Sequence, residues 1–323
     1  MRKLIVLGLL AGLALAALFA IPAGAKPPGA NGRIVFARFD PAAGDTFTYT
    51  VNPDGSHVQQ LFSAHPSNTP HWSPDGIEVA IFCCDDGMAA HFVNPDTGSF
   101  REVAPPDPTL ETHCGFSWSP DGQRLACESY GVTDPSRNGV YSIRASDGGG
   151  LTRITSNPGG SDIPGDYSPD GKRLVFVRGD QNGPVGLFVI KLNGSGLRQI
   201  TPPGLIVQDF FGGSWSPSGD KIVFAARTDP DHRLAIWVVS ADGSGLHQLP
   251  ITPSCGGAFS DARSISCRDP GWSPDGTKIV FTRATKGTPS SIYTVNADGS
   301  GLSQVTNARG DSQPDWGPHP LAG

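Results

Sequence analysis

Short apolar runs recur along the chain at nearly even spacing. Each is rich in β-branched, aromatic or small apolar side chains, and each follows a polar segment of turn-forming residues. The clearest copies are 79–81, 125–127, 174–176, 222–224 and 279–281. Short apolar runs bounded by turn residues predict buried β-strands. No stretch shows the periodicity of an amphipathic helix, so the pattern indicates an all-β protein.

A five-residue motif, Trp-Ser-Pro-Asp-Gly, stands shortly before these runs. Complete copies occupy 72–76, 118–122 and 272–276, copies with one change occupy 167–171 and 215–219, and a truncated copy occupies 316–318. Successive copies start 44 to 57 residues apart. Proline presets φ for a turn, Asp bonds to the backbone two residues on, and Gly takes the left-handed position. A motif repeated at this period predicts an array of similar units.

A second turn signal divides each unit again. Asp-Gly or Asn-Gly pairs, and one Asp-Thr-Gly, lie between apolar runs at 54–55, 96–98, 147–148, 193–194, 242–243 and 298–299. Such pairs are a strong signal for a β-hairpin. Each unit is therefore predicted to be a four-stranded antiparallel meander, with strands named A to D in chain order.

The first unit lacks a strand A, and the chain ends with a spare one. Residues 34–36 form an apolar run without a preceding motif, whereas 311–316 resemble a strand A with no unit after it. Pairing the last strand with the first unit gives six complete blades and leaves no open flank. The sequence thus predicts a six-bladed β-propeller over residues 26–323, closed by its C-terminal strand.

The repeat resembles a known family. The pattern from Pro270 to Thr306, Pro-x-Trp-Ser-Pro-Asp-Gly-x-x-Ile-Val-Phe followed by Ile-Tyr-x-Val-Asn-x-Asp-Gly-Ser-Gly-Leu, is similar to the WD40-like repeat of TolB-type six-bladed propellers. The resemblance extends over residues 31–318. TolB is a periplasmic protein of a cell-envelope complex, so the resemblance implies a scaffold for protein contacts. Related propellers accompany hydrolases of the prolyl oligopeptidase type, but the chain has no Gly-x-Ser-x-Gly motif, and that activity is not expected.

Residues 1–25 have the pattern of a signal peptide. Arg2 and Lys3 precede an uncharged apolar run at 4–21, and 23–25 read Ala-Gly-Ala. This arrangement favours cleavage, and the alternative is an uncleaved membrane anchor. No cysteine follows the run, so a lipoprotein is not expected. Cleavage would change the formal net charge from −6 to −8, since the two basic residues leave.

Modest negative charge without a basic stripe argues against nucleic acid as a partner. We expect an exported monomer, periplasmic or extracellular, that is not bound to a membrane once its leader is removed. The broad face of a propeller suits a protein or another component of the cell envelope as partner.

Chain direction assigns the two faces of the ring. The A–B and C–D turns are uniform and share one face, here called the turn face. The B–C loops and D-to-A crossings are uneven in length and share the other, here called the variable face. Insertions in repeat proteins gather on the face that binds, so we expect the partner at the variable face.

Strand A should line the central channel, and its first residues should ring the channel mouth at the variable face. The polar residues predicted there, as a ligand-binding set, are His113, Asp162, Asp209, Arg268 and Asp311. The alternative, which we favour, is that these groups hydrogen-bond between blades and to channel water. The repeated Trp and Tyr at the end of strand A are interpreted as packing between blades.

No cofactor or metal is expected. His71, His91 and His113 fall in adjacent units, but none has a second histidine or cysteine at ligand spacing. The Asp-Gly turns also lack the alternating acids and terminal Glu of calcium loops.

Six cysteines in an exported chain suggest disulfides. Cys255 and Cys267 bracket a long D-to-A crossing, and Cys114 and Cys127 lie on opposite arms of one predicted hairpin. Cys83 and Cys84 are neighbours, which allows either a vicinal bond or pairing with another blade. The sequence does not decide among these connectivities.

Two functions follow from these observations. The favoured one is a non-enzymatic docking scaffold. The alternative is an enzyme at the channel mouth, such as a metal-assisted lactonase or polysaccharide lyase, which would require carboxylates and histidines to converge on the axis.

Overall fold

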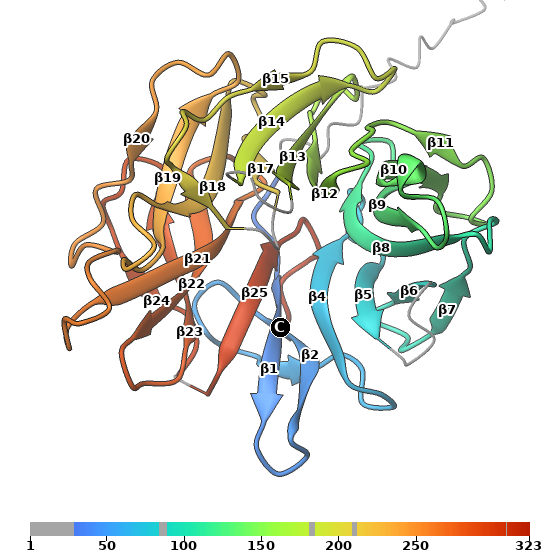
Figure 1. Ribbon diagram of the computed structural model, residues 1–323. Helices are drawn as coiled ribbons and strands as arrows, with labels where there is room; N and C mark the ends of the chain where they lie inside the picture. The colour runs from blue at the N-terminus through green and yellow to red at the C-terminus, as the bar shows by residue number, and fades with distance from the viewer. Residues whose placement is uncertain (1–28, 84–88, 181–184, 209–211, 308) are drawn as a thin grey trace, which may run out of the picture.

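Six antiparallel sheets surround a central axis (Figure 1). The computed structural model of the protein describes residues 29–83, 89–180, 185–208, 212–307 and 309–323. Within these ranges the one helical segment is the 3-10 turn η1 (Pro135–Arg137). No helix of the described residues has the length and apolarity needed to cross a membrane. The predicted all-β, six-bladed propeller is confirmed.

The first three blades follow the predicted A-to-D order, with the C-terminal strand as strand A of the first. Blade one contains β25 (Asp311–Trp316), β1 (Ile34–Asp40), β2 (Asp45–Val51) and β3 (Gln59–Gln60). Blade two contains β4 (Ser67–Trp72), β5 (Val79–Cys83), β6 (Ala90–Val93) and β7 (Phe100–Val103). Blade three contains β8 (Leu110–Trp118), β9 (Arg124–Gly131), β10 (Gly139–Arg144) and β11 (Thr152–Arg153).

The other three blades repeat this order. Blade four contains β12 (Gly160–Tyr167), β13 (Arg173–Asp180), β14 (Gly186–Lys191) and β15 (Arg198–Gln199). In blade five strand A is divided, so that β16 (Ile206–Val207) and β17 (Ser214–Trp215) both pair with β18 (Lys221–Arg227), followed by β19 (Ala235–Ser240) and β20 (His247–Gln248). Blade six contains β21 (Ile265–Trp272), β22 (Lys278–Thr285), β23 (Ser291–Asn296) and β24 (Ser303–Gln304).

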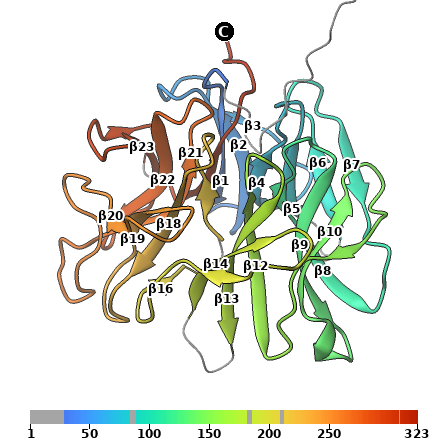
Figure 2. The same ribbon diagram turned by 90° about the horizontal axis from the view of Figure 1, so that it is seen from above.

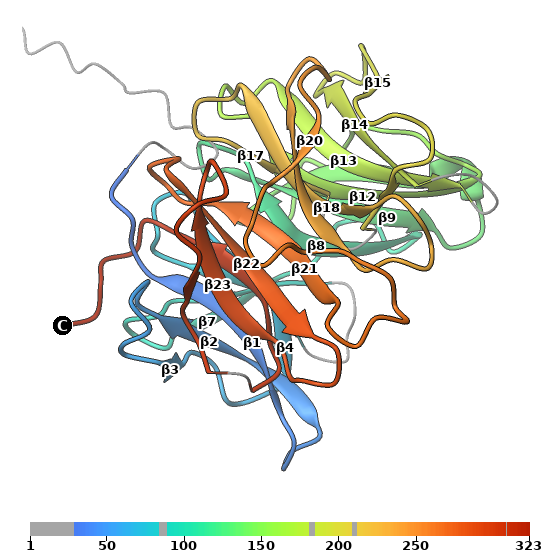
Figure 3. The ribbon, with the colours of Figure 1, turned by 90° about the vertical axis from the view of Figure 1, so that its left-hand side faces the viewer.

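The ring closes through β25 and β1, which lie side by side in Figure 1. Their antiparallel register places Ile34 opposite Trp316 and Arg38 opposite Asp311. Trp316 is buried against Ile34 and Phe36, and its indole Nε1 donates to the carbonyl of Gly32 at 2.9 Å. The start of β1 and the C-terminal tail therefore leave the ring together, as Figures 2 and 3 show.

The Ser-Pro-Asp-Gly turns join strands A and B through a repeated set of hydrogen bonds. In blade two, Ser73 Oγ donates to Asp75 Oδ1 at 2.6 Å and accepts from the backbone N–H of Glu78 at 2.9 Å. Blade five carries Ser218 in place of Asp, and there Asp220 accepts from Ser216 Oγ at 3.0 Å. The carboxylate has moved two residues along the chain, and the turn is preserved.

The core lies between neighbouring blades. Each apolar cluster combines strands from two blades, as where Trp118 packs 5.2 Å from the ring of Phe92. The aromatic at the end of each strand A is buried, consistent with its predicted role in packing between blades.

Two disulfides agree with the pairs proposed from sequence. Cys114 bonds to Cys127 across the β8–β9 ladder, and Cys255 bonds to Cys267 around the long crossing of blade six. Cys83 is also disulfide-bonded. Cys84 lies outside the described residues, so the vicinal pairing stays a prediction.

Candidate functional site

The axis is lined by strand A of each blade, and this strand is bulged just before its aromatic residue. The pairing of β4, β12, β21 and β25 with strand B shifts register there. At this bulge Thr69, Asp269 and Gln313 have φ between 50° and 55°. The left-handed region is uncommon for residues other than glycine, and a bulge re-aims a side chain. Here it directs polar groups toward the channel.

A belt of hydrogen bonds runs around the channel at the level of the bulges. The backbone N–H of Thr69 donates to Gln313 Oε1 at 2.9 Å, and the backbone N–H of Gln313 donates to Asp269 Oδ2 at 3.3 Å. Gln208 Nε2 donates to Asp269 Oδ1 at 2.6 Å, and Thr282 Oγ1 donates to Oδ2 at 2.9 Å. The belt thus joins blades five, six, one and two through one buried carboxylate.

A second set of contacts joins blades at the residue before the strand-A aromatic of blades one, three and four. Asp315 Oδ2 accepts from the backbone N–H of Trp72 at 2.9 Å. Asp166 Oδ2 accepts in the same way from Trp215 at 3.3 Å, and Ser117 Oγ from Tyr167 at 3.2 Å. Each bond reaches from one blade to the next. These side chains satisfy a buried backbone donor and bring two carboxylates close to the axis.

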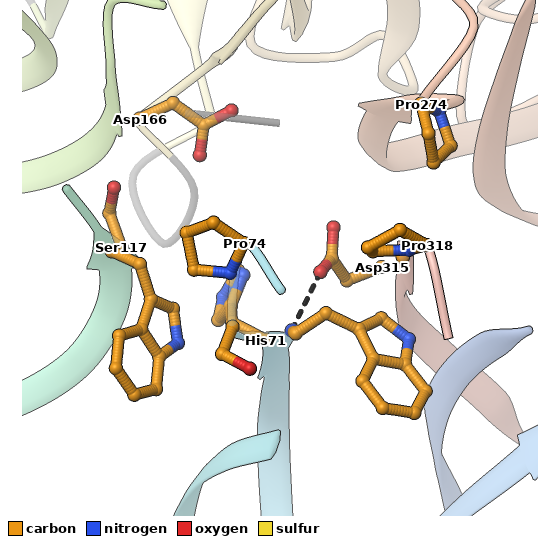
Figure 4. A pocket seen from close by; sticks show the side chains of 11 residues that line it. His71, Pro74, Ser117, Asp166, Pro274, Asp315 and Pro318 are labelled. Atoms are coloured by element: carbon orange, nitrogen blue, oxygen red, sulfur yellow. Dashed lines mark hydrogen bonds between the residues drawn. The ribbon is translucent and has the colours of Figure 1, made fainter. Parts of the chain in front are cut away.

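A small axial recess lies at the turn-face end of the channel, and Figure 4 shows the side chains that line it. Asp166 and Asp315 face it from blades four and one, with His71 and Ser117 beside them. A second recess along the axis shares His71, Asp166 and Asp315 and adds Asp269. Neither lining contains Lys or Arg among the described residues. The two recesses therefore bring the carboxylates of Asp166, Asp269 and Asp315 and the imidazole of His71 to the axis.

The carboxylates predicted at the variable-face mouth are paired within their own blades. Asp162 is 1% exposed and binds Arg178 through two bonds of 2.7 Å. Asp311 is fully buried and binds Arg38 through bonds of 2.6 and 2.9 Å. Bidentate pairs of this kind hold strand A to strand B.

The other predicted residues of that ring have different surroundings. Arg268 lies beside Asp269, with Nε 3.5 Å from its Oδ2. Asp209 lies outside the described residues. Among the described residues, no three His, Cys, Asp or Glu side chains gather closely enough to hold a metal ion.

His113 belongs to an acidic cluster between blades three and four. It faces Glu128 across the β8–β9 ladder, and its Nε2 is 3.4 Å from Glu111 Oε1. Glu128 is 8% exposed and accepts a hydrogen bond from the Tyr130 hydroxyl.

Burial raises the pKa of Glu128 to about 6. The Tyr130 hydrogen bond opposes this shift, and the charges of Asp162 and Glu111 add to it. Burial and the same hydrogen bond raise the pKa of Tyr130. A carboxyl group that titrates near pH 6 can exchange protons under mild conditions.

Sequence reasoning missed Glu128 and Tyr130, along with Asp166, Asp269 and Asp315. One signal was available for Glu128, which directly follows the apolar run at 125–127 on a strand read as buried. A second signal was the position relative to the aromatic, since Asp166 and Asp315 each stand one residue before it. The predicted binding set instead lies four to six residues before the aromatic.

The variable face carries one loop with a covalent staple. The Cys255–Cys267 disulfide closes the crossing into blade six. This loop is also bonded to the neighbouring B–C loop of blade five, because Phe259 N–H donates to the carbonyl of Asp231 and Arg233 N–H donates to that of Gly257. Phe259 is 41% exposed, with the Arg233 guanidinium 5.3 Å from its ring centre. The staple and these bonds hold an aromatic and a cation together at the surface.

Comparison with known proteins identifies relatives of this propeller. A family model described as the TolB beta propeller domain matches residues 31–320. An uncharacterized protein of Agrobacterium fabrum is 29% identical over 245 residues, covering 72% of this chain and 75% of that protein. The Tol-Pal system protein TolB of Bordetella pertussis is 26% identical over 143 residues, covering 44% of this chain but only 31% of TolB.

Among solved structures, TolB from Acinetobacter baumannii is similar with a TM-score of 0.67 and 19% identity. That similarity covers 88% of this chain and 66% of the other, and at this identity it shows the fold alone.

Proposed function

Because the chain belongs to the TolB β-propeller family, we propose that it is an exported, non-enzymatic scaffold that docks another protein or a cell-envelope component. The observation that carries this proposal is the stapled loop of the variable face. Its exposed Phe259 is held beside Arg233, as described above. Aromatic and Arg side chains dominate the binding energy of protein interfaces, and holding them rigid lowers the entropic cost of association.

Two features of the chain support export: the sequence of its first 25 residues and its disulfide bonds. The sequence of residues 1–25 has the charge and apolar pattern of a leader. The Cys114–Cys127 and Cys255–Cys267 disulfides are typical of an oxidising compartment, such as the periplasm or the extracellular space. The TolB proteins that the chain resembles are named as parts of the Tol-Pal system, which supports a protein partner of the envelope.

The variable face can be tested by affinity capture from an envelope extract. The tagged protein is compared with a Phe259→Ala, Arg233→Ala variant. A matched control is Ile77→Ala, since Ile77 is 56% exposed in a turn of the opposite face. We expect the variable-face variant to lose the captured partner and the control to retain it. Equal recovery by all three proteins would contradict the proposed docking face.

A second candidate function is catalysis at the variable-face mouth, and the Glu128 cluster is the observation that favours it. A buried carboxyl group with a pKa of about 6, bonded to a tyrosine and facing a histidine, suits general acid–base chemistry. Polyuronides and lactones are the substrates to assay, with and without divalent metal. Activity that depends on Glu128, and that Glu128→Gln abolishes, would favour the enzyme. Activity that survives in Glu128→Gln would remove this cluster from consideration.

A further inference from the structure

The C-terminal tail, residues 317–323, continues past β25 on the turn face and is bound by residues of blades one and two (Figure 3). Its backbone pairs with the chain before β1, where the N–H of Arg33 donates to the carbonyl of His319 at 2.9 Å. Farther along, Asn52 Nδ2 donates to the carbonyl of Ala322 at 3.1 Å, and Asn52 Oδ1 accepts from its N–H at 3.0 Å. These bonds reach only the backbone of the tail, so they would hold any extended segment.

One side chain anchors the tail. His319 is 6% exposed, whereas Leu321 is 55% exposed. The imidazole of His319 stacks on the Trp72 ring, with ring centres 4.9 Å apart and an angle of 10° between the planes. Its Nδ1 donates to the carbonyl of Gly76 at 2.9 Å, and its Nε2 lies 3.3 Å from Asp96 Oδ1. The surroundings therefore fit a flat ring with polar atoms on two edges, which histidine provides.

Two glycines leave room for the backbone of the tail. A Cβ on Gly32 would lie 2.0 Å from the carbonyl oxygen of His319, and its three nearest atoms would all belong to the tail. A Cβ on Gly76 would lie 2.8 Å from the backbone nitrogen of His319. Gly76 is also required by its turn, since its φ is 72°, but Gly32 lies outside the left-handed region. The tail, and not the backbone conformation, accounts for glycine at position 32.

The residues that surround the tail are here called the tail site: Gly32, Asn52, Trp72, Gly76 and Asp96. We propose that the tail site is a peptide-binding site, which the chain's own tail occupies and from which a partner can displace it. The kind of partner that fits is an extended segment with a Pro-His-Pro core, the sequence of the tail at 318–320. Backbone bonds provide affinity and the ring provides specificity, as in strand addition. The tail site lies on the face opposite to the stapled loop, so it does not depend on the function proposed above.

A tethered tail competes with a free peptide for the same site. On a short tether the effective concentration of the tail is on the order of 1 mM. A peptide that binds the emptied site with a Kd of about 0.1 mM should therefore bind the unaltered protein about tenfold more weakly. Emptying the site in the full chain should reveal this difference.

The tail is released by His319→Asp, which removes the stacked ring and places a carboxylate beside Asp96, where like charges repel. Binding of a fluorescent peptide with the sequence of residues 317–323 is followed by anisotropy. We expect saturable binding to this variant and binding about tenfold weaker to the unaltered protein. The same peptide with Asp in place of His should not bind. Absence of saturable binding to His319→Asp would overturn the proposal.

Glycine substitutions test where the peptide binds. In the His319→Asp background, Gly32→Ala should abolish peptide binding, because the added Cβ occupies the position of the peptide carbonyl. Gly159→Ala is the matched control, since a Cβ there meets no other part of the described chain within 4 Å and should leave binding unchanged. Peptide binding that persists after Gly32→Ala would count decisively against the tail site.

Hydrogen exchange of the unaltered protein provides a test that needs no variant. A displaceable tail opens without unfolding of the ring. The amide of Arg33, which donates to His319, should therefore exchange at least about a hundredfold faster than the slowest amides of β5, after correction for intrinsic rates. Equal rates would show that the tail leaves only when the ring unfolds, and the proposal would be wrong.

Discussion

Replacing Glu128 by Gln is expected to stabilise the protein at neutral pH. Burial raises the pKa of this carboxyl group from its ordinary value of 4.5 to about 6. Between these pH values the folded protein holds a proton on Glu128 that the unfolded chain releases. The contribution of Glu128 to the unfolding free energy is therefore greatest below pH 4.5 and is lost as the pH rises through about 6. The difference between these two pKa values corresponds to about 2 kcal/mol of unfolding free energy lost at neutral pH, where Glu128 is charged and buried. The amide of the Glu128→Gln variant stays neutral, so the variant does not lose this free energy.

The assay is urea unfolding of the unaltered protein and the Glu128→Gln variant at several values between pH 4.5 and 8. The difference in unfolding free energy should grow by about 2 kcal/mol in favour of the variant, mostly between pH 4.5 and 6.5. Glu102→Gln is the control, because Glu102 is exposed on β7. A difference between the unaltered protein and Glu128→Gln that does not change with pH would refute the reasoning.

Two further predictions concern the contacts that close the first blade. Trp316→Ala removes a buried ring from the cluster with Ile34 and Phe36. We expect urea unfolding to show that the free energy of unfolding falls by about 3 to 5 kcal/mol. A decrease below about 1 kcal/mol would mean that this contact contributes little to stability. Asp311→Asn breaks a buried bidentate pair with Arg38 and should cost about 3 kcal/mol. Asp147→Asn breaks an exposed pair with Arg144 and should cost much less, because water screens exposed charges. Equal losses in these two variants would show that burial does not control the strength of the pair.

The blades were predictable because their signals are local. A turn such as 73–78 is specified by residues within six positions, and the same signal recurs between strands A and B of blades two to six. The altered turn of blade five could also be predicted from local sequence, because Asp220 supplies the carboxylate that Ser218 lacks. Even the closure by 311–316 followed from counting strands.

The axial site was harder to predict because it depends on the bulges. The register shift between Arg268 and Gly271 alters which residues of strand A face the channel. Simple alternation along an unbulged strand cannot place Asp269, whose left-handed backbone belongs to that irregularity. The positions of Asp166 and Asp315 relative to the axis depend in the same way on neighbouring blades.

Pairing β1 with β25 also constrains the order of events during synthesis. The two strands are separated by nearly the whole polypeptide, so the inner edge of β1 has no native neighbour until residue 316 has been made. An unpaired strand edge can recruit other chains, and contacts between distant segments form slowly. Blades two to six can assemble progressively as they emerge. The ring closes only when the C-terminal strand β25 pairs with β1. An export pathway that delivers the chain unfolded would postpone this closure until after translocation.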